Sequence, residues 1–372
     1  MARTATKREF ALVAACCRPL GDPARATAVR ESALPDLDWQ HLLRLAQRHR
    51  VEPLVLDGLR SAGIDLPQDA LALAEQVAAG AAERLAYVAE TLRLSARFEE
   101  AGIAMLCIKG APLEQLAYAR TGIKQSRDVD LLVDPCDLER AHGLLADLGY
   151  TCDYPEDFSR MQSDPVWRDG FMRDEKETVW RRGRLLVEVH WRLVRSHVLF
   201  SGIGAGGPSQ SVELARGRPV ATLALPELYA YLSMHGAHHG WYRLKWLADL
   251  IALVADLPDD ELVRLHDRAV ELLVGRCSAQ ALLLGERLLG LKLPRALSAR
   301  LSTDRAVRSM VGFGAAVLSA DVPDGRVHEQ PRFGGRLLWL HWQSSQDWSY
   351  RRELAARCAG MLAERVRQGL RR

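Results

Sequence analysis

At 372 residues, the chain is long enough for two or three domains or subdomains, and its 48% hydrophobic residues can fill a sizeable core. A formal net charge of +3 argues against a dedicated nucleic-acid binder, whose domain would be strongly basic. The seven cysteines are scattered and include no Cys-x-x-Cys pair, which argues against a disulfide framework and favours a reducing, cytoplasmic location. No segment reaches the roughly 18 apolar residues that a membrane helix needs, and we find no signal peptide.

Residues 1–100 have the composition and spacing of helices. Asp38 is a suitable N-terminal cap, and Trp39 and Leu43 then fall on one face of the helix that it would begin. The stretch 70–100 is a long run rich in Ala, Leu and Glu, which favours helix. The sequence therefore predicts a helical region before the first strand.

A short apolar run at residues 103–108 predicts a strand that ends in a turn. Lys109 and Gly110 form this turn, and Pro112 suits the first turn of the helix that follows. Free backbone N–H groups at such a helix N-terminus point toward an anion, and Lys109 adds a positive charge. The segment therefore predicts an anion site.

The segment 126–133, with the sequence SRDVDLLV, predicts a second strand that carries two acidic residues. Asp128 and Asp130 would lie side by side on one face, while Val129 and Leu131 bury the other. Two adjacent carboxylates repel each other unless a cation lies between them, and Mg²⁺ prefers one or two carboxylates together with substrate phosphates. The pattern indicates a metal-dependent phosphate site; a solvated strand edge is the alternative.

A helix and a further strand follow. Residues 138–148 form the predicted helix, which Gly149 ends. Residues 185–191 alternate as a strand in which Glu188 and His190 share one face. That face can bring a third carboxylate to the same metal centre.

From Pro226 the pattern is helical again. Three histidines there share a helix face, and a zinc site is one interpretation of them: His235, His238 and His239. Structural zinc usually takes four protein ligands, so we favour a nucleotide-facing role for this part of the chain. Charge and stacking would come from Tyr242, Arg243, Lys245 and Trp246. Further on, the sequence predicts amphipathic helices at 259–300, a loop at 321–335 and a basic helix at 351–372.

Four motifs follow one another along the chain: Lys109-Gly110, residues 126–133, Leu148-Gly149-Tyr150 and Glu188-Val189-His190-Trp191. In this order they resemble the uncharacterised bacterial nucleotidyltransferase family of the DNA polymerase β-like superfamily. The likeness covers roughly residues 38–255. It implies an α+β fold that is mostly α, with a small mixed sheet flanked by helices. We expect an N-terminal helical region at 1–100, a nucleotidyltransferase catalytic core at 101–225 and a C-terminal helical domain at 226–372.

The resemblance also implies roles for individual residues. The catalytic residues and metal ligands would be Asp128, Asp130 and Glu188, with Mg²⁺ as the ion and Mn²⁺ as the alternative. The nucleotide-binding residues would be Lys109, Gly110, Arg127, His190 and Lys245. Two positions depart from the superfamily pattern. The superfamily often has Gly-Ser or Gly-Gly at the turn, where this chain has Lys109-Gly110. It often has aspartate at the third acidic position, where this chain has Glu188.

We therefore expect a Mg²⁺-dependent nucleotidyltransferase that moves an NMP from an NTP, with ATP as the first candidate, to an acceptor hydroxyl. Two metal ions about 3.5–4 Å apart can stabilise the attacking and leaving oxygens of such a displacement. The acceptor would be a small molecule, a peptide or a protein, since the small net charge disfavours a nucleic acid. The glycine-rich residues 201–210 would form a lid or an acceptor-binding loop. The alternative is a catalytically inactive nucleotide- or peptide-binding partner protein that retains the fold, which the Lys109-Gly110 turn favours.

Overall fold

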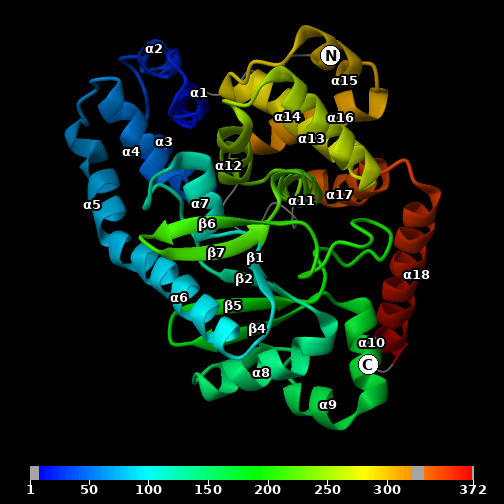
Figure 1. Cartoon of the computed structure of the whole chain (residues 1–372). Helices are drawn as coiled ribbons and strands as arrows, with labels where there is room; N and C mark the ends of the chain where they lie inside the picture. The colour runs from blue at the N-terminus through cyan, green and yellow to red at the C-terminus, as the bar shows by residue number, and fades with distance from the viewer. Residues whose placement is uncertain (1–7, 321–330, 371–372) are drawn as a thin grey trace.

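The computed structural model describes residues 8–320 and 331–370, and a small sheet lies against a larger body of helices (Figure 1). This arrangement confirms the predicted fold class, α+β and mostly α, and the mixed character of the sheet. Within the described ranges, no helix is both long and apolar enough to cross a membrane.

Helices precede the sheet, as the sequence predicts. Asp38 caps one of them, because its Oδ1 accepts a hydrogen bond from the backbone N–H of His41 at 2.8 Å. The elements are α1 (Arg8–Cys16), α2 (Arg25–Ser32), α3 (Trp39–His49), α4 (Glu52–Ser61), a 3₁₀ turn (Gln68–Ala70), α5 (Leu71–Ala79) and α6 (Ala81–Glu100).

The main sheet has the strand order β1-β2-β5-β4-β3. Strands β2 and β5 are parallel, and the other neighbouring pairs are antiparallel. Its strands are β1 (Met105–Cys107), β2 (Val129–Val133), β3 (Thr151–Tyr154), β4 (Glu177–Arg182) and β5 (Leu185–His190). The connecting helices are α7 (Ala111–Tyr118), α8 (Leu138–Asp147) with a 3₁₀ turn before it (Pro135–Asp137), α9 (Phe158–Ser163) and α10 (Pro165–Asp174). A separate hairpin, β6 (Ser209–Ala215) and β7 (Arg218–Leu223), packs beside α7 and β1.

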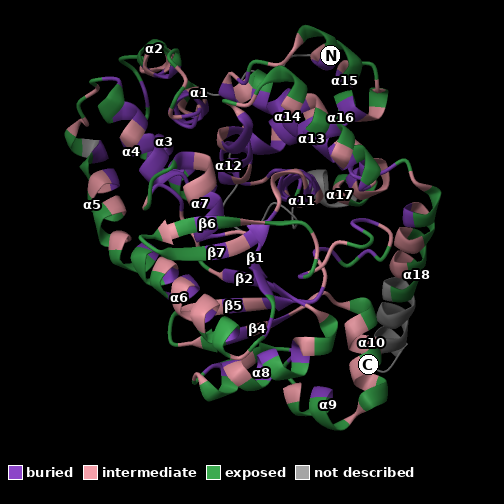
Figure 2. Ribbon diagram, viewed as in Figure 1, coloured by how far each residue is buried: buried purple, intermediate pink, exposed green. Residues whose placement is uncertain are grey.

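The two faces of the sheet are buried against different partners. Val129, Leu131 and Val189 belong to a hydrophobic cluster that includes residues of α6 and α8. Leu132, on the opposite face, belongs to the larger cluster of the helical body. Figure 2 shows the buried residues concentrated in these strands and in the central helices. Because side chains alternate along a strand, Asp130 shares the face of Leu132 and is turned toward the helical body.

The helices after the sheet complete that body together with the N-terminal ones. They are α11 (Leu225–His238), α12 (Leu244–Val254), α13 (Asp259–Glu271), α14 (Gly275–Leu289), α15 (Arg295–Ser302), α16 (Arg305–Leu318), α17 (Pro331–Ser344) and α18 (Trp348–Leu370). Phe10 and Leu42 from the N-terminal helices share one hydrophobic cluster with Leu250 and Leu284 from α12 and α14. The helices before the sheet therefore pack against helices that follow it.

Three predicted boundaries were wrong. β2 begins at Val129, where its pairing with β5 begins, so Asp128 precedes the strand. β6 begins at Ser209, inside the predicted glycine-rich loop 201–210. α17 begins at Pro331, inside the predicted loop 321–335, and Pro suits the first turn of a helix. Residues 321–330 lie outside the described residues.

Candidate functional site

Asp130 and Glu188 lie side by side on the two parallel strands. The register of β2 and β5 pairs Asp130 with Glu188, and Leu132 with His190. The Asp130 side chain is 0% exposed, whereas that of Glu188 is 26% exposed and can meet a substrate. The structure therefore brings together two of the three predicted metal ligands.

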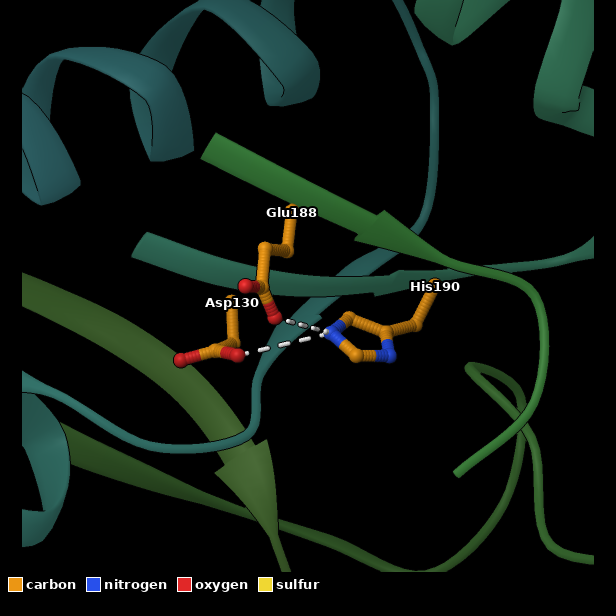
Figure 3. Close-up of side chains that lie close together, drawn as sticks. All are labelled: Asp130, Glu188 and His190. Carbon is orange, nitrogen blue, oxygen red and sulfur yellow. Dashed lines mark ion pairs between the residues drawn. The ribbon is translucent and has the colours of Figure 1, made fainter. Parts of the chain in front are cut away.

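His190 joins these carboxylates to form a cluster. One ligand atom from each of Asp130, Glu188 and His190 lies within 4.8 Å of the others, and Figure 3 shows the three side chains pointing toward one another. Oδ2 of Asp130 is buried and has no hydrogen-bond partner among the described residues, whereas Oδ1 is engaged in ion pairs with Lys109 and His190. Buried polar atoms in this state are rare, and carboxylate oxygens are ligands that Mg²⁺ and Mn²⁺ accept. The donor set therefore fits a divalent cation, and no other such cluster occurs in the described part of the chain.

Lys109 supplies a compensating charge. Its Nζ lies 2.7 Å from Oδ1 of Asp130, although the contact is not aligned as a hydrogen bond. Burial acts to raise the pKa of the Asp130 carboxyl, but Lys109 and His190 outweigh it and hold that pKa well below its ordinary value. Burial likewise acts to lower the pKa of Lys109, and the charge of Asp130 holds it well above the ordinary value. Both groups are therefore charged.

Gly110 shapes the turn next to this ion pair. Its φ of +75° and ψ of −133° lie in a region that essentially only glycine adopts. α7 begins at the following residue, and the backbone N–H of Ile108 donates to the carbonyl of Asp130 at 3.0 Å, which ties the turn to β2. The N-terminus of α7 therefore lies beside the cluster, where its free N–H groups can bind an anion.

Two further predicted residues lie just before β2. Asp128 is half-buried, and its carboxylate is not part of the cluster. Arg127 is exposed, and its carbonyl oxygen accepts a hydrogen bond from the Tyr87 hydroxyl at 2.7 Å. The structure therefore does not bring either side chain together with Asp130 and Glu188.

Lys245 reaches the same segment from α12. Its Nζ donates to the carbonyl of Gln125 at 2.9 Å. Burial, and then the charge of nearby Lys124, lower the pKa of Lys245 to about 7. Lys124 is also buried and lies 3.8 Å from one carboxylate oxygen of Asp249. Two buried lysines therefore lie near each other, Lys245 on α12 and Lys124 on the segment that leads to Asp128, with Asp249 among the carboxylates around them.

Glu177 and Lys176, at the start of β4, are site residues that sequence reasoning missed. Oε2 of Glu177 lies 3.1 Å from Nδ1 of His190, and Nζ of Lys176 lies 3.4 Å from the same nitrogen. The signal was available, because Gly183 marks the turn of a hairpin. A hairpin that pairs Arg182 with Leu185 places Glu177 opposite His190.

The three histidines that suggested a zinc site have different partners, although the rings of His235 and His239 lie 4.6 Å apart between centroids. Nε2 of His238 lies 3.1 Å from Oγ of Ser344. The rings of His235 and His239 instead pack against Trp246, with centroid distances of 5.1 and 5.2 Å. These side chains form no metal-binding group among the described residues.

A cavity of about 190 Å³ lies beside the segment that follows β5. It is lined by residues between Arg192 and Ile203, including His197 and the exposed Ser201. Pockets for drug-sized ligands are larger, at about 300–1,000 Å³. The cavity is therefore suited to an end group rather than to a whole nucleotide.

In the comparison with known families, the family described as "Uncharacterised nucleotidyltransferase" matches residues 35–290. A comparison with curated proteins gives no match. The matched range includes the main sheet, the cluster around Asp130 and the helices from α3 to α14. Because the match covers more than half of the chain, the chain belongs to this family of uncharacterised nucleotidyltransferases.

Proposed function

We propose that the chain transfers an NMP from an NTP, with ATP as the first candidate, to a hydroxyl of a small-molecule, peptide or protein acceptor. The family supports nucleotidyl transfer in general. The observation that carries the proposal is the pairing of Asp130 with Glu188 on adjacent parallel strands, where the buried Oδ2 of Asp130 has no partner among the described residues. This geometry supports a site that holds a divalent ion against a phosphate.

The ligands that we propose for the ion, Mg²⁺ or Mn²⁺, are Asp128, Asp130 and Glu188. Asp128 precedes Asp130 by two residues, so their Cα atoms are at most ~7 Å apart. When bound, the ion would stabilise the negative charge that develops on the transferring phosphate. Lys109 and the N-terminus of α7 beyond Gly110 would bind phosphate oxygens from the other side.

Lys245 and Arg127 are the further phosphate contacts that we propose. Lys245 is buried beside Lys124, and an anion placed there would relieve the repulsion between two ammonium groups. Arg127 is exposed and free to form a bidentate contact with a phosphate. His190 is itself a member of the cluster.

The reaction balances as an in-line displacement. The acceptor hydroxyl oxygen attacks the α-phosphorus, and the bond from that phosphorus to the oxygen bridging to the β-phosphate breaks, so pyrophosphate leaves. Glu188 takes up the hydroxyl proton. Burial, and then the negative charge of Asp130, raise the pKa of Glu188, which makes it a stronger base.

The acceptor would approach along the segment that follows β5. This segment lines the cavity of about 190 Å³, and Arg192, its first lining residue, follows His190 by two residues. Part of the predicted loop 201–210 also lines it, including Ser201. The position supports an acceptor-binding role for this loop.

A second candidate is a catalytically inactive partner protein that binds a nucleotide or a peptide. The ion pair of Lys109 with Asp130 favours it, because the ammonium already compensates the carboxylate that a metal ion would need. The two candidates differ in whether pyrophosphate is released.

The test is calorimetric titration with the α,β-methylene analogues of the four NTPs in the presence of Mg²⁺. We expect the wild type to bind at least one analogue, and Asp130→Asn and Glu188→Gln to bind it at least tenfold more weakly. Asp147→Asn is the control, since that carboxylate is exposed on α8. Absence of binding to a folded wild type, or equal binding by Asp130→Asn, would refute the proposed site. Analogue binding without pyrophosphate release from NTP, across a panel of hydroxyl acceptors, would select the second candidate.

A further inference from the structure

Nε2 of His190 is a buried nitrogen aimed between two carboxylates. It lies 3.4 Å from Oδ1 of Asp130 and 3.4 Å from Oε2 of Glu188, and the side chain is 0% exposed (Figure 3). It has no hydrogen-bond partner in the described part of the chain. Both distances are longer than those of a normal N–H···O hydrogen bond. The nitrogen and the two carboxylate oxygens instead face a common centre between them.

The other ring nitrogen of His190 is fixed from behind. Nδ1 lies 3.1 Å from Oε2 of Glu177, which the register of β4 and β5 places directly opposite, and 3.4 Å from Nζ of Lys176. Since an ammonium cannot accept a proton, Glu177 is the acceptor for an N–H at Nδ1. A histidine that ligates a metal almost always gives its second ring N–H to a carboxylate or carbonyl, which sets the tautomer and the orientation of the ring. Glu177 occupies that position, so the imidazole is presented with Nε2 toward Asp130 and Glu188.

We propose that His190 is a direct ligand, through Nε2, of the divalent ion held by Asp130 and Glu188, and that Glu177 positions it. The inference rests on the proposed function only in assuming that this cluster holds the ion. A site with a histidine ligand differs in its chemistry from a site built of carboxylates alone. Mg²⁺ prefers oxygen ligands and water, whereas imidazole suits later first-row transition ions such as Fe²⁺ and Zn²⁺, and Mn²⁺ is the first member of that affinity series. The site therefore selects Mn²⁺ over Mg²⁺, because Mn²⁺ accepts both oxygen and nitrogen donors.

The competing arrangement is an ion-pair network with no metal. In that case His190 is an imidazolium between Asp130, Glu188 and Glu177, and Lys109 completes the charge balance. Such a network stabilises the fold but creates no nitrogen ligand. A spectroscopic signature of the nitrogen distinguishes the two arrangements. Loss of activity does not distinguish them, because both arrangements predict it.

The experiment uses Mn²⁺ as the probe, with the full chain and without NTP. Electron spin echo modulation detects the ¹⁴N of an imidazole bonded to Mn²⁺, and titration of the free-ion signal, with Mg²⁺ in competition, gives the affinities. We expect ¹⁴N coupling in the wild type and its loss in His190→Gln, together with at least a tenfold fall in the preference for Mn²⁺ over Mg²⁺. Glu177→Gln retains the coupling and binds Mn²⁺ 10- to 100-fold more weakly.

His142→Gln is the matched control, because it removes another buried imidazole next to the same sheet and leaves the coupling intact. Mn²⁺ bound to a folded wild type without ¹⁴N coupling would overturn the inference, as would unchanged selectivity in His190→Gln or absence of Mn²⁺ binding. Metal-dependent NTP binding without ¹⁴N coupling would remove this inference and leave the proposed function standing. If ¹⁴N coupling is seen but no NTP binds, this inference would stand and the proposed function would be refuted.

Discussion

Nζ of Lys109 lies 2.7 Å from Oδ1 of Asp130, and the two side chains are 18% and 0% exposed. The lysine comes from the turn after β1, and the aspartate from the neighbouring strand β2. A lysine ammonium therefore occupies one side of the carboxylate that the proposed metal ion needs. Binding of the ion must displace this ammonium or share the carboxylate with it.

We predict that Lys109→Met binds Mn²⁺ at least tenfold more tightly than the wild type, because the ion then meets no competing cation at Asp130. Without metal, the same variant should lose about 3–5 kcal/mol of stability, since a buried carboxylate is left uncompensated. Urea unfolding with and without Mn²⁺ measures both effects. Lys292→Met removes an exposed lysine and serves as the control. Unchanged Mn²⁺ affinity in Lys109→Met would show that the ion pair and the metal site are independent.

Gly110→Ala tests the turn that begins α7. At φ +75° and ψ −133°, a side chain strains the backbone, so we expect a loss of about 1–3 kcal/mol in the free energy of unfolding. We also expect weaker binding of NTP analogues, because the N–H groups of α7 would shift away from the site. Gly143→Ala on α8 is the matched control; a Cβ there meets no atom within 4 Å. A stable Gly110→Ala with full analogue affinity would exclude the turn as a phosphate site.

Local patterns in the sequence were sufficient for much of the site. The alternation along 126–133 predicts that Asp130 and Val129 lie on opposite faces of their strand. The alternation along 185–191 predicts that Glu188 and His190 share one face. The structure confirms both predictions. The turn at Lys109-Gly110 also precedes a helix, as the sequence predicts. These features depend on neighbours in the chain, which a single sequence displays.

The remaining features depend on pairing between distant segments. The ion pair of Lys109 with Asp130 requires the pairing of β1 with β2, two strands that are separated by a helix and a loop. The contact of Glu177 with His190 requires only the hairpin of β4 and β5, whose turn at Gly183 the sequence does display. Asp128 was placed on the strand because the pattern continues through it, yet the pairing with β5 begins one residue later. The shared core of the N-terminal and C-terminal helices is likewise invisible to helix periodicity, which indicates a buried face but not its partner.

Binding of an NTP should be coupled to uptake of a proton by Lys245. The pKa of Lys245 is lowered to about 7, so at pH 8 much of the free protein carries this lysine neutral. A bound triphosphate would favour the ammonium and raise that pKa. Calorimetry of an NTP analogue at pH 8, in two buffers of different ionisation enthalpy, measures the uptake. We expect up to one proton for the wild type and the Lys292→Met control, and less for Lys245→Met. Equal uptake in all three would place the phosphates away from Lys245.

The stability of the fold should fall below neutral pH because of buried histidines such as His142. Its Nε2 lies 3.0 Å from Oγ1 of Thr178, and burial lowers the pKa of His142 to about 4 from the usual 6.5. The unfolded chain therefore binds a proton between pH 6.5 and pH 4 that the folded protein does not. Stability contributed by the neutral imidazole is complete above pH 6.5 and is lost as the pH falls toward 4.

We predict that His142→Gln flattens the dependence of unfolding free energy on pH in this window by up to about 3 kcal/mol, the linkage value for a shift of this size. Urea unfolding at a series of pH values between 7 and 4 provides the measurement. His197→Gln removes an exposed histidine and should leave the slope as in the wild type. If His142→Gln shows the wild-type slope, the imidazole takes up its proton in the folded protein, and Thr178 must then act as its acceptor.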